Sequence, residues 1–437
     1  MKNKAFLTFL LLLVLTAVTW VGLFKNQTKA AVSYSGYLST ADKCMAKGIY
    51  IDAIKNYKSA LETDHKYETA MKLVSAYQKL GDYEGMITAC DEAIEISPKS
   101  IEPYSDKIDY YISKAEYQDA LKVMETAKDV SDQNKLKEIK ANLHTKFDMK
   151  YLDYTDVKDW HTQKDLDYIA VCLNDKWGMA SSDGTMKINA QFDSLGAYSD
   201  QEEVIPCSLN GENYYIDKDG NRKLVGDKSY TYLGSFGSGY APAQFDGKYG
   251  YIDKDFKEYH FEYDYAGAFA NGIAAVQKNG KWALINDKFK SVTDFIYDDI
   301  KLDSYGFCSV YGAETAEKDG LYYLIDTSGK NIIKTGYSNM SMAASKDGAV
   351  AVEKDGKWGF VSRDDKMIID PQYDDAVSFS LGFAPVKKGD NWAYIDENNQ
   401  AICDFQYSDA KPFSENGSAA VGSYGYWSFI VLCEYEK

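Results

Sequence analysis

The amino-acid sequence predicts a multidomain chain in which an α-helical repeat region is followed by an all-β region of repeated units. Three observations lead to this fold class. Helical periodicity between Val32 and about Phe147 recurs every 33 or 34 residues, alternating strands rich in Tyr, Phe and Val begin near Tyr154, and a β unit centred on one aromatic residue then recurs eight times. We expect the helical domain over 32–148 and the β domain over 154–437.

Three helical copies align at the tyrosines Tyr50, Tyr83 and Tyr117. They read "GIYIDAIKNYKSALE", "GDYEGMITACDEAIEISP" and "AEYQDALKVMETAK". A period of this length is typical of helix-turn-helix solenoids, in which each repeat buries its apolar face against its neighbours. Residues 134–147 are predicted to form an extra helix that covers the last repeat.

The helical copies resemble the tetratricopeptide repeat. The middle copy matches that family's pattern at Leu73, Tyr77, Gly81, Tyr83, Ala93 and Pro98, and departs from it at Val74 and Met86. The resemblance implies a groove, lined by the first helix of each repeat, that holds a peptide or protein segment. The groove positions correspond here to Glu68, Met71, Ser75, Gln78, Glu102, Ser105 and Asp109. Their acidic and polar character favours a basic or polar ligand, although solvated helix faces would show the same residue types.

The β unit has a central aromatic position that repeats along the chain. Its occupants are, in order, Trp177, Asn213, Tyr249, Trp282, Tyr322, Trp358, Trp392 and Tyr426. Glycine follows in three copies, as Gly178, Gly250 and Gly359. One spacing is longer than the others, at 40 residues, and we attribute it to an insertion around "YGAETAEKDG". The tryptophans are predicted to pack between neighbouring units.

The segments "GKWGFVS" and "DKWGMAS" resemble the WG-repeat (KWG) family of bacterial proteins, and the resemblance extends over nearly all of 154–437. Units this small must stack to bury a core, either radially in a ring or as an open β-solenoid. The last copy lacks its Tyr-x-Asp-Ala-x-x-Phe segment, whereas "YTDVKDW" (Tyr154 to Trp160) precedes the first copy. This favours an eight-bladed, β-propeller-like ring in which the N-terminal end supplies the missing strand.

The N-terminus carries an uncharged apolar run from Ala5 to Phe24, preceded by Lys2 and Lys4. Twenty residues span a bilayer core of about 30 Å, so residues 1–30 are predicted to be an uncleaved signal anchor. The early lysines then place the bulk of the chain outside the cytoplasm, at the cell membrane. The alternative is a secretory signal cleaved near "TKAA" (residues 28–31), which would release the protein.

No cofactor, metal or catalytic site is predicted. The net charge of -17 argues against a nucleic-acid partner, because phosphate binding requires a basic surface. The four histidines stand in no catalytic or metal-binding motif, and the seven cysteines form no CxxC pair. The loop "DKDGN" partly resembles a calcium loop, but Asp217, Asp253, Asp326 and Asp396 all follow the second strand of a unit, which favours turn formation.

The sequence therefore predicts a membrane-anchored, extracytoplasmic binding or scaffold protein without catalytic activity. Two alternatives remain open at this point. One is a lectin-like module that binds cell-wall or surface glycans through exposed aromatic residues such as Tyr230, Tyr232 and Tyr424. The other is a carboxylate-dependent glycan hydrolase, which requires two facing Asp or Glu side chains roughly 5–10 Å apart in a cleft.

Overall fold

A computed structural model describes residues 33–159, 168–226, 228–309 and 311–433. The chain separates into two compact units, with the division between Leu143 and His144. The predicted anchor over residues 1–30 lies outside the described residues, as does the alternative cleavage site. Within the described ranges, no helix combines the length and the hydrophobicity that a membrane crossing requires.

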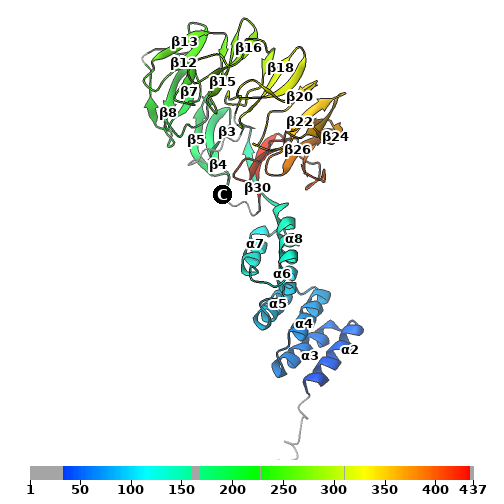
Figure 1. Cartoon of the computed structure of the whole chain (residues 1–437). Helices are drawn as coiled ribbons and strands as arrows, with labels where there is room; N and C mark the ends of the chain where they lie inside the picture. The colour runs from blue at the N-terminus through cyan, green and yellow to red at the C-terminus, as the bar shows by residue number, and fades with distance from the viewer. Residues whose placement is uncertain (1–32, 160–167, 227, 310, 434–437) are drawn as a thin grey trace, which may run out of the picture. The chain divides into compact units, whose positions relative to one another are not determined.

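The first unit is built from helices that pack in consecutive pairs. Their bounds are α2 (Tyr34–Ala46), α3 (Tyr50–Thr63), α4 (Tyr67–Leu80), α5 (Tyr83–Ile96), α6 (Glu102–Ser113), α7 (Tyr117–Thr126) and α8 (Gln133–His144). Helix α2 packs on α3, α4 on α5 and α6 on α7 (Figure 1). The turn inside each pair contains one residue in the left-handed region: Gly48 at φ 71°, Gly81 at φ 78° and Ala115 at φ 57°. Only the third copy forms this turn without glycine, which costs roughly 1 kcal/mol.

Small residues allow the paired helices to approach closely. Ala53, Ala70 and Ala93 are completely buried. Val74 and Met86, the two departures from the tetratricopeptide pattern, are also buried, each with 1% of its surface exposed. The larger side chains are accommodated within the same hydrophobic core. The departures therefore change the packing inside the repeat and not the path of its helices.

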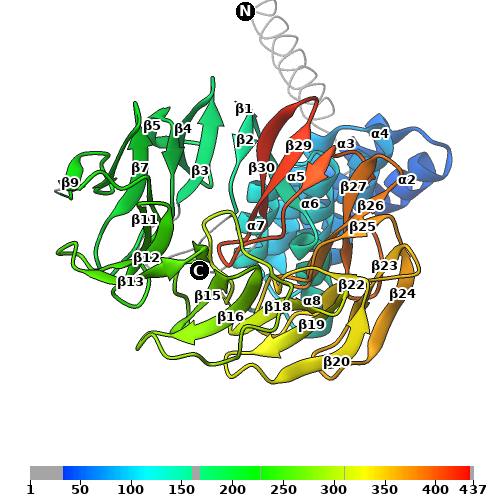
Figure 2. The same ribbon diagram turned by 90° about the horizontal axis from the view of Figure 1, so that it is seen from above.

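The second unit consists of eight small antiparallel sheets arranged around a ring (Figures 1 and 2). Blades one to four are β2–β5 (Asp156–Val157, Tyr168–Leu173, Lys176–Ser181, Met186–Phe192), β6–β9 (Ser194–Leu195, Ile205–Leu209, Glu212–Ile216, Arg222–Leu224), β10–β13 (Tyr232–Leu233, Ala241–Phe245, Lys248–Ile252, Glu258–Tyr263) and β14–β16 (Tyr265–Ala266, Ile273–Lys278, Lys281–Asn286). Blades five to eight are β17–β20 (Asp299–Ile300, Ala313–Lys318, Leu321–Asp326, Asn331–Tyr337), β21–β24 (Asn339–Met340, Val350–Lys354, Lys357–Val361, Met367–Tyr373), β25–β27 (Asp375–Ala376, Phe383–Lys388, Asn391–Asp396) and β28–β30 with β1 (Asp409–Ala410, Ser418–Ser423, Tyr426–Leu432, Phe147–Tyr154). Each blade begins with a two-residue inner strand.

The ring is closed by pairing between the two ends of the β unit. Strand β1 is the outer strand of blade eight and pairs with β30, in a register that sets Phe147 opposite Leu432 and Tyr154 opposite Trp427. The predicted eight-bladed ring is confirmed, and the open β-solenoid is not formed. The closing strand is β1, which begins at Phe147 and ends at Tyr154. The predicted closing segment is divided differently, because its Asp156 and Val157 form the inner strand of blade one.

The repeated aromatic residue occupies one fixed place in the blade. It lies on the third strand, opposite an aromatic residue of the fourth strand or of the chain that replaces it: Trp177 faces Phe192, Tyr249 faces Tyr263, Trp282 faces Tyr297, Tyr322 faces Tyr337, Trp358 faces Tyr373 and Trp392 faces Tyr407. Trp358 and Trp392 are buried, and Trp177 and Trp282 are half-buried. Gly178, Gly250 and Gly359 are buried beside them, close to the outer strand.

Two details of the repeat alignment are corrected by strand register. In blade eight the aromatic position is Trp427, which pairs with Tyr154, whereas Tyr426 stands at the hairpin end and is 50% exposed. The long spacing in blade five also has a different origin. Strands β18 and β19 form a regular hairpin, so the extra residues lie before it, in the 301–312 connection between β17 and β18.

Neighbouring blades are joined by a repeated aspartate. Asp193, at the end of blade one, accepts Lys176 Nζ at 2.5 Å with Oδ1 and the backbone N–H of Asn210, in blade two, at 2.6 Å with Oδ2. The same double contact recurs at Asp264, Asp298 and Asp374. The lysine hydrogen bond is the main reason that the pKa of each of these carboxyls is lowered. The Lys and Asp of the repeat therefore connect one blade to the next.

The predicted turn role of the other repeated aspartate is confirmed. Asp217 Oδ1 accepts the backbone N–H groups of Asp219 and Asn221, both at 2.9 Å. Asp253, Asp326 and Asp396 make the same pair of contacts in their own blades. Within the described chain no group of three or more His, Cys, Asp or Glu residues could hold a metal ion.

Blade five carries a carboxyl group where the other blades carry alanine, isoleucine or valine. Glu314 stands opposite Ile325, as Ala274 stands opposite Ile285 and Ala384 opposite Ile395. It is completely buried, and within the described chain neither carboxyl oxygen has a hydrogen-bond partner, although Ser309 lies beside it. Burial, together with the nearby Asp326, raises the pKa of Glu314 to about 7.

We predict that Glu314→Gln stabilises the β unit above neutral pH. A folded-state pKa raised from 4.5 to about 7 destabilises the native fold as pH rises through that window, by roughly 3 kcal/mol once the group is ionised. The melting temperature of the variant should therefore equal that of the wild type near pH 4.5 and exceed it by several degrees at pH 8. An equal difference at both pH values would contradict a buried charge at this position.

Candidate functional site

The first strands of the eight blades lie around the centre of the ring, which we call the channel (Figure 2). The second residue of each inner strand is buried in its blade: Val157, Leu195, Leu233, Ala266, Ile300, Met340, Ala376 and Ala410. The residue that follows this buried residue occupies one repeated position at the inner edge of each blade, which we call the channel position. These channel residues are Lys158, Gly196, Gly234, Gly267, Lys301, Ser341, Val377 and Lys411. The channel is thus lined unevenly, with lysines in blades one, five and eight.

Within the described residues, one connection enters this channel. Blade five joins its first two strands through residues 301–312, whereas blade four uses only 267–272. We call Leu302–Phe307 the plug loop. Asp303 folds it into a turn, since its Oδ1 accepts the backbone N–H groups of Tyr305 and Phe307, both at 2.9 Å. Gly306 has φ 92° in this turn, a conformation that favours glycine.

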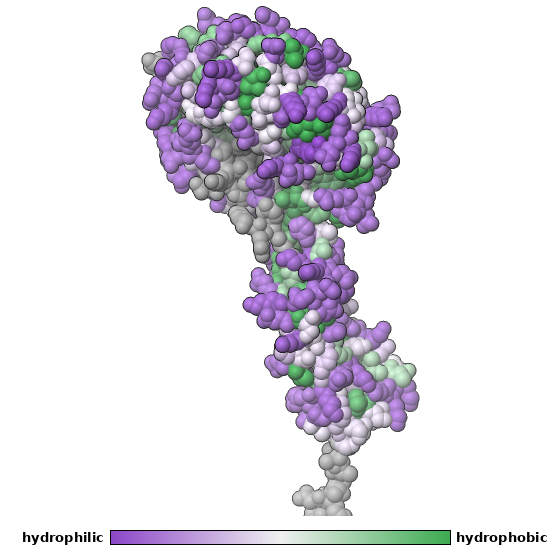
Figure 3. Space-filling view, viewed as in Figure 1, coloured by the Kyte–Doolittle hydropathy of each residue, from purple (hydrophilic) through white to green (hydrophobic). Residues whose placement is uncertain are grey.

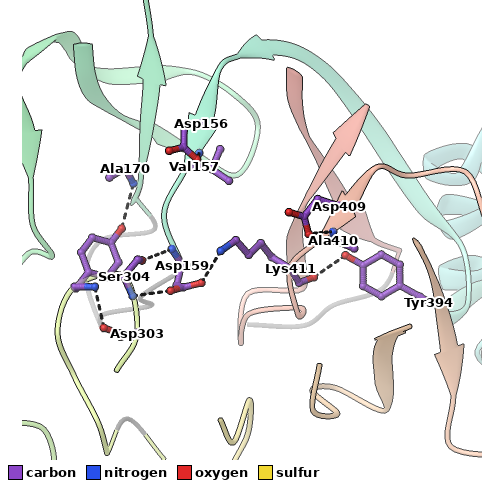
Figure 4. A network of polar contacts seen from close by, with 11 residues as sticks. Asp156, Val157, Asp159, Ala170, Asp303, Ser304, Tyr394, Asp409, Ala410 and Lys411 are labelled. Carbon is purple, nitrogen blue, oxygen red and sulfur yellow. Dashed lines mark hydrogen bonds and ion pairs between the residues drawn. The ribbon is translucent and has the colours of Figure 1, made fainter. Parts of the chain in front are cut away.

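The plug loop is held by blades on both sides. Ser304 N donates to Asp159 Oδ2 at 2.8 Å, and Asp159 N donates to Ser304 Oγ at 2.7 Å (Figure 4). Ala268 N, in blade four, donates to Gly306 O at 2.8 Å. A side chain at Gly267 would meet the same carbonyl oxygen, with its Cβ 2.8 Å away. Part of the channel is therefore filled by backbone from blade five.

The three lysines of the channel form contacts with neighbouring blades. Lys411 Nζ lies 3.0 Å from Asp159 Oδ1, and about one third of each side chain is exposed (Figure 4). Lys301 Nζ donates to Asn339 Oδ1 at 2.7 Å. Lys158 Nζ donates to the carbonyl oxygen of Leu195 at 2.6 Å. Each lysine of the channel thus reaches from its own blade to an adjacent one.

The pKa values of Asp159 and Asp303 are shifted in opposite directions. Burial alone would raise the pKa of Asp159, but Lys411 and the hydrogen bonds from Ser304 outweigh it and hold the pKa below the usual value. Burial and the nearby Asp159 raise the pKa of Asp303 to about 7, despite its backbone hydrogen bonds. Burial lowers the pKa of Lys158 and of Lys301.

A cavity of about 320 Å³ lies beside the plug loop. Its polar lining consists of Asp159, Lys301, Asp303, Tyr311, Ser341, Lys411 and Ser414, and its apolar lining of Leu302, Met342, Ala343, Ala344, Val377, Pro412 and Phe413. These residues come from blades five to eight, with Asp159 from blade one. The cavity combines a hydrophobic wall with converging charged groups, which is the usual make-up of a small-molecule site.

Asp159 and Asp303 also bear on the predicted hydrolase alternative, because they line one cavity and have opposite pKa shifts. The hydrogen bonds of Asp159 and Asp303 stabilise the folded chain. Asp159 accepts from Lys411 and from the backbone of Ser304, and Asp303 accepts from two backbone N–H groups of its own loop. These contacts hold the plug loop in its position.

The predicted groove residues fall on two helices. Glu68, Met71, Ser75 and Gln78 lie on α4, and Glu102, Ser105 and Asp109 lie on α6. All seven side chains are exposed or half-exposed. On the face of the helical unit seen in Figure 3, hydrophilic side chains predominate. Tyr67 Oη donates to Glu102 Oε2 at 2.9 Å, which connects α4 to α6.

Two carboxylates on this side of the helical unit were not anticipated from the sequence. Asp106, on α6, accepts a hydrogen bond from Gln78, and its pKa is raised by burial and by the nearby Asp109 and Glu102. Asp42, on α2, binds Lys72 of α4 through both carboxylate oxygens at 2.9 Å. Neither residue is among the predicted groove positions, and for Asp106 the available signal was its place four residues after Glu102 on the same helix.

The predicted aromatic cluster for glycans is not formed by the named residues. Tyr230 is buried, with 5% of its surface exposed. Tyr232 belongs to the inner strand of blade three and is half-buried, whereas Tyr424 stands at the blade-eight hairpin and is 99% exposed. These three tyrosines therefore do not form the shared exposed face that the glycan-binding alternative requires.

Comparison with known proteins bears on both units. Residues 215–249, 249–282, 324–358, 358–392 and 392–427 match the family model of the WG containing repeat, so the expected resemblance is shown for these five segments of the β unit. No curated protein matches the chain.

Among solved structures, the chain is similar to MamA, with 21% identity over 25% of this chain and 62% of MamA and a TM-score of 0.22. It spans less than two thirds of that protein. It is also similar to the first TPR of Spaghetti (RPAP3) bound to the HSP90 peptide SRMEEVD, with 19% identity over 25% of this chain and 93% of the other and a TM-score of 0.22. A third is the Cps50 (Swd1) β-propeller domain of Myceliophteria thermophila, with 8% identity, coverage of 65% and 98%, and a TM-score of 0.37.

We predict that Asp159→Ala loosens the plug loop. The substitution removes the hydrogen bond from Ser304 N and the one from Lys411 Nζ, and it leaves the lysine ammonium without its carboxylate, at a cost of about 2 kcal/mol. Hydrogen exchange at the amides of Ser304 and Tyr305 should become at least about tenfold faster. Asp287→Ala, at an exposed turn, is the matched control, and equal exchange in both variants would refute the role assigned to Asp159.

Proposed function

We propose that the protein is an interaction scaffold whose helical repeats bind a basic peptide or protein segment. The observation that supports this best is the group of carboxylates on α4 and α6. Glu68, Glu102 and Asp109 are exposed, and Asp106 lies half-buried among them. The lysines of α4 are Lys72, which is paired with Asp42, and Lys79, at the last turn of the helix.

The raised pKa of Asp106 indicates how a ligand would be favoured. Its shift arises from burial and from repulsion by Asp109 and Glu102. An arginine or lysine placed between these carboxylates would relieve that repulsion and form charge-assisted hydrogen bonds. Met71 and Tyr67 add apolar surface on α4. The expected ligand is therefore an extended segment in which basic residues alternate with apolar ones.

Selection from a random peptide display library on the full chain tests this proposal. We expect enrichment of peptides rich in Arg and Lys, with affinity that falls as salt is raised, because surface charges supply the attraction. The double variant Glu102→Lys/Asp109→Lys should weaken binding at least about tenfold. Glu125→Lys, on an exposed position of α7, is the matched control. Selection of acidic peptides, or equal weakening by the control, would overturn the proposal.

We further propose that residues 5–24 anchor this scaffold in a membrane, with the helical and β units outside the cytoplasm. The support is the length of the uncharged run and the lysines before it. The full chain should partition with membranes and be degraded by protease added to intact cells. Removal of residues 1–30 should release it into the soluble fraction. Protection from the protease in intact cells would reverse the proposed orientation.

A further inference from the structure

We propose that the cavity beside the plug loop binds a small organic carboxylate with an apolar body. This binding site goes beyond the scaffold function and uses other residues. The inference rests on the donors that face the cavity, on its hydrophobic wall and on its size.

Two ammonium groups supply the donors. Lys301 and Lys411 both line the cavity. Among the described residues, Lys301 Nζ has one hydrogen-bond partner, Asn339 Oδ1 at 2.7 Å, and Lys411 Nζ has Asp159. An ammonium has three N–H donors, so each group can still donate to a ligand oxygen. Asp159 and Asp303, by contrast, already accept hydrogen bonds from the plug loop.

The lysines are not requirements of the repeat. At the same channel position, the other blades have glycine, serine or valine, as at Gly196, Ser341 and Val377. The third lysine of the channel, Lys158, donates to Leu195 O and lies 5.1 Å from the centre of the Tyr305 ring. It supports the plug loop, whereas Lys301 and Lys411 remain at the cavity.

Carboxylates near Lys301 set the charge balance. Asp299, Asp375, Glu317 and Glu353 all act to raise the pKa of Lys301, against the lowering by burial. These four groups do not line the cavity. They oppose loss of the ammonium charge, and they also weaken the attraction for an anion. The expected ligand therefore carries a single charge and gains the rest of its affinity from apolar contact.

The wall and the volume limit the ligand further. Leu302, Met342, Val377, Pro412 and Phe413 provide the apolar contact. About 320 Å³ is at the small end of the range for ligand sites. A monocarboxylate with one aromatic ring or a short hydrocarbon chain fits both limits, with its carboxylate at the lysines and its body against the wall.

The test uses benzoate, phenylacetate and hexanoate as probes on the full chain, measured by titration calorimetry and by saturation-transfer NMR. Benzyl alcohol is the neutral match, and inorganic phosphate is the anion without an apolar body. We expect at least one carboxylate to bind, and both benzyl alcohol and phosphate to bind at least about tenfold more weakly. No binding by any of the three carboxylates would overturn the proposal, as would equal binding of benzyl alcohol or of phosphate.

Variants locate the site. Lys301→Met should weaken carboxylate binding at least about tenfold, and Ser341→Leu should do the same by filling the cavity without removing a charge. Lys318→Met, at an exposed end of β18, is the matched control and should bind as the wild type does. Melting curves show which variants are folded, and the two cavity variants change the site in unrelated ways. Unchanged binding in either folded cavity variant would place the ligand elsewhere and refute the site.

Discussion

The pairing of β1 with β30 is the constraint on which the β unit depends. Without it, blade eight would lack its outer strand and expose an unpaired edge, and the inner strands would have no fixed centre to surround. Segments from opposite ends of the unit, Phe147–Tyr154 and Tyr426–Leu432, complete one sheet. Closure also brings Asp159 next to Lys411, although the two are 252 residues apart in sequence.

The shape and the lining of the centre of the ring are set by residues that depart from the repeat. Eight identical connections would give a symmetric channel, but in the described part of the chain the plug loop enters from blade five and is tied to Asp159 and Ala268. The remaining space becomes a cavity lined by two lysines and a hydrophobic wall. Function in such an architecture depends on residues that depart from the repeat, because the repeated residues are occupied in joining blades.

In the helical unit, too, the candidate binding residues are distinct from the residues of the core. Its repeated alanines and tyrosines form the core, and Glu102, Asp106 and Asp109 lie at helical spacing on α6, where Asp109 and Glu102 repel the Asp106 carboxylate. These carboxylates lie on the surface of the helical unit, where a bound cation would reduce the repulsion between them. Both units therefore carry charged groups that the core does not require.

The sequence by itself determined the helical period, the number of β units and the aspartate turns, because each follows from short-range patterns that recur many times, and it favoured the ring over an open β-solenoid. It also indicated that the two ends of the β unit close the ring. It did not locate the plug loop, the Asp159–Ser304–Lys411 cluster or the buried Glu314, and it assigned Tyr426 to a position that belongs to Trp427. The environment of Glu314 depends on strand register, and the contacts of Asp159 join residues 145 or more positions apart, which meet only once the ring has closed.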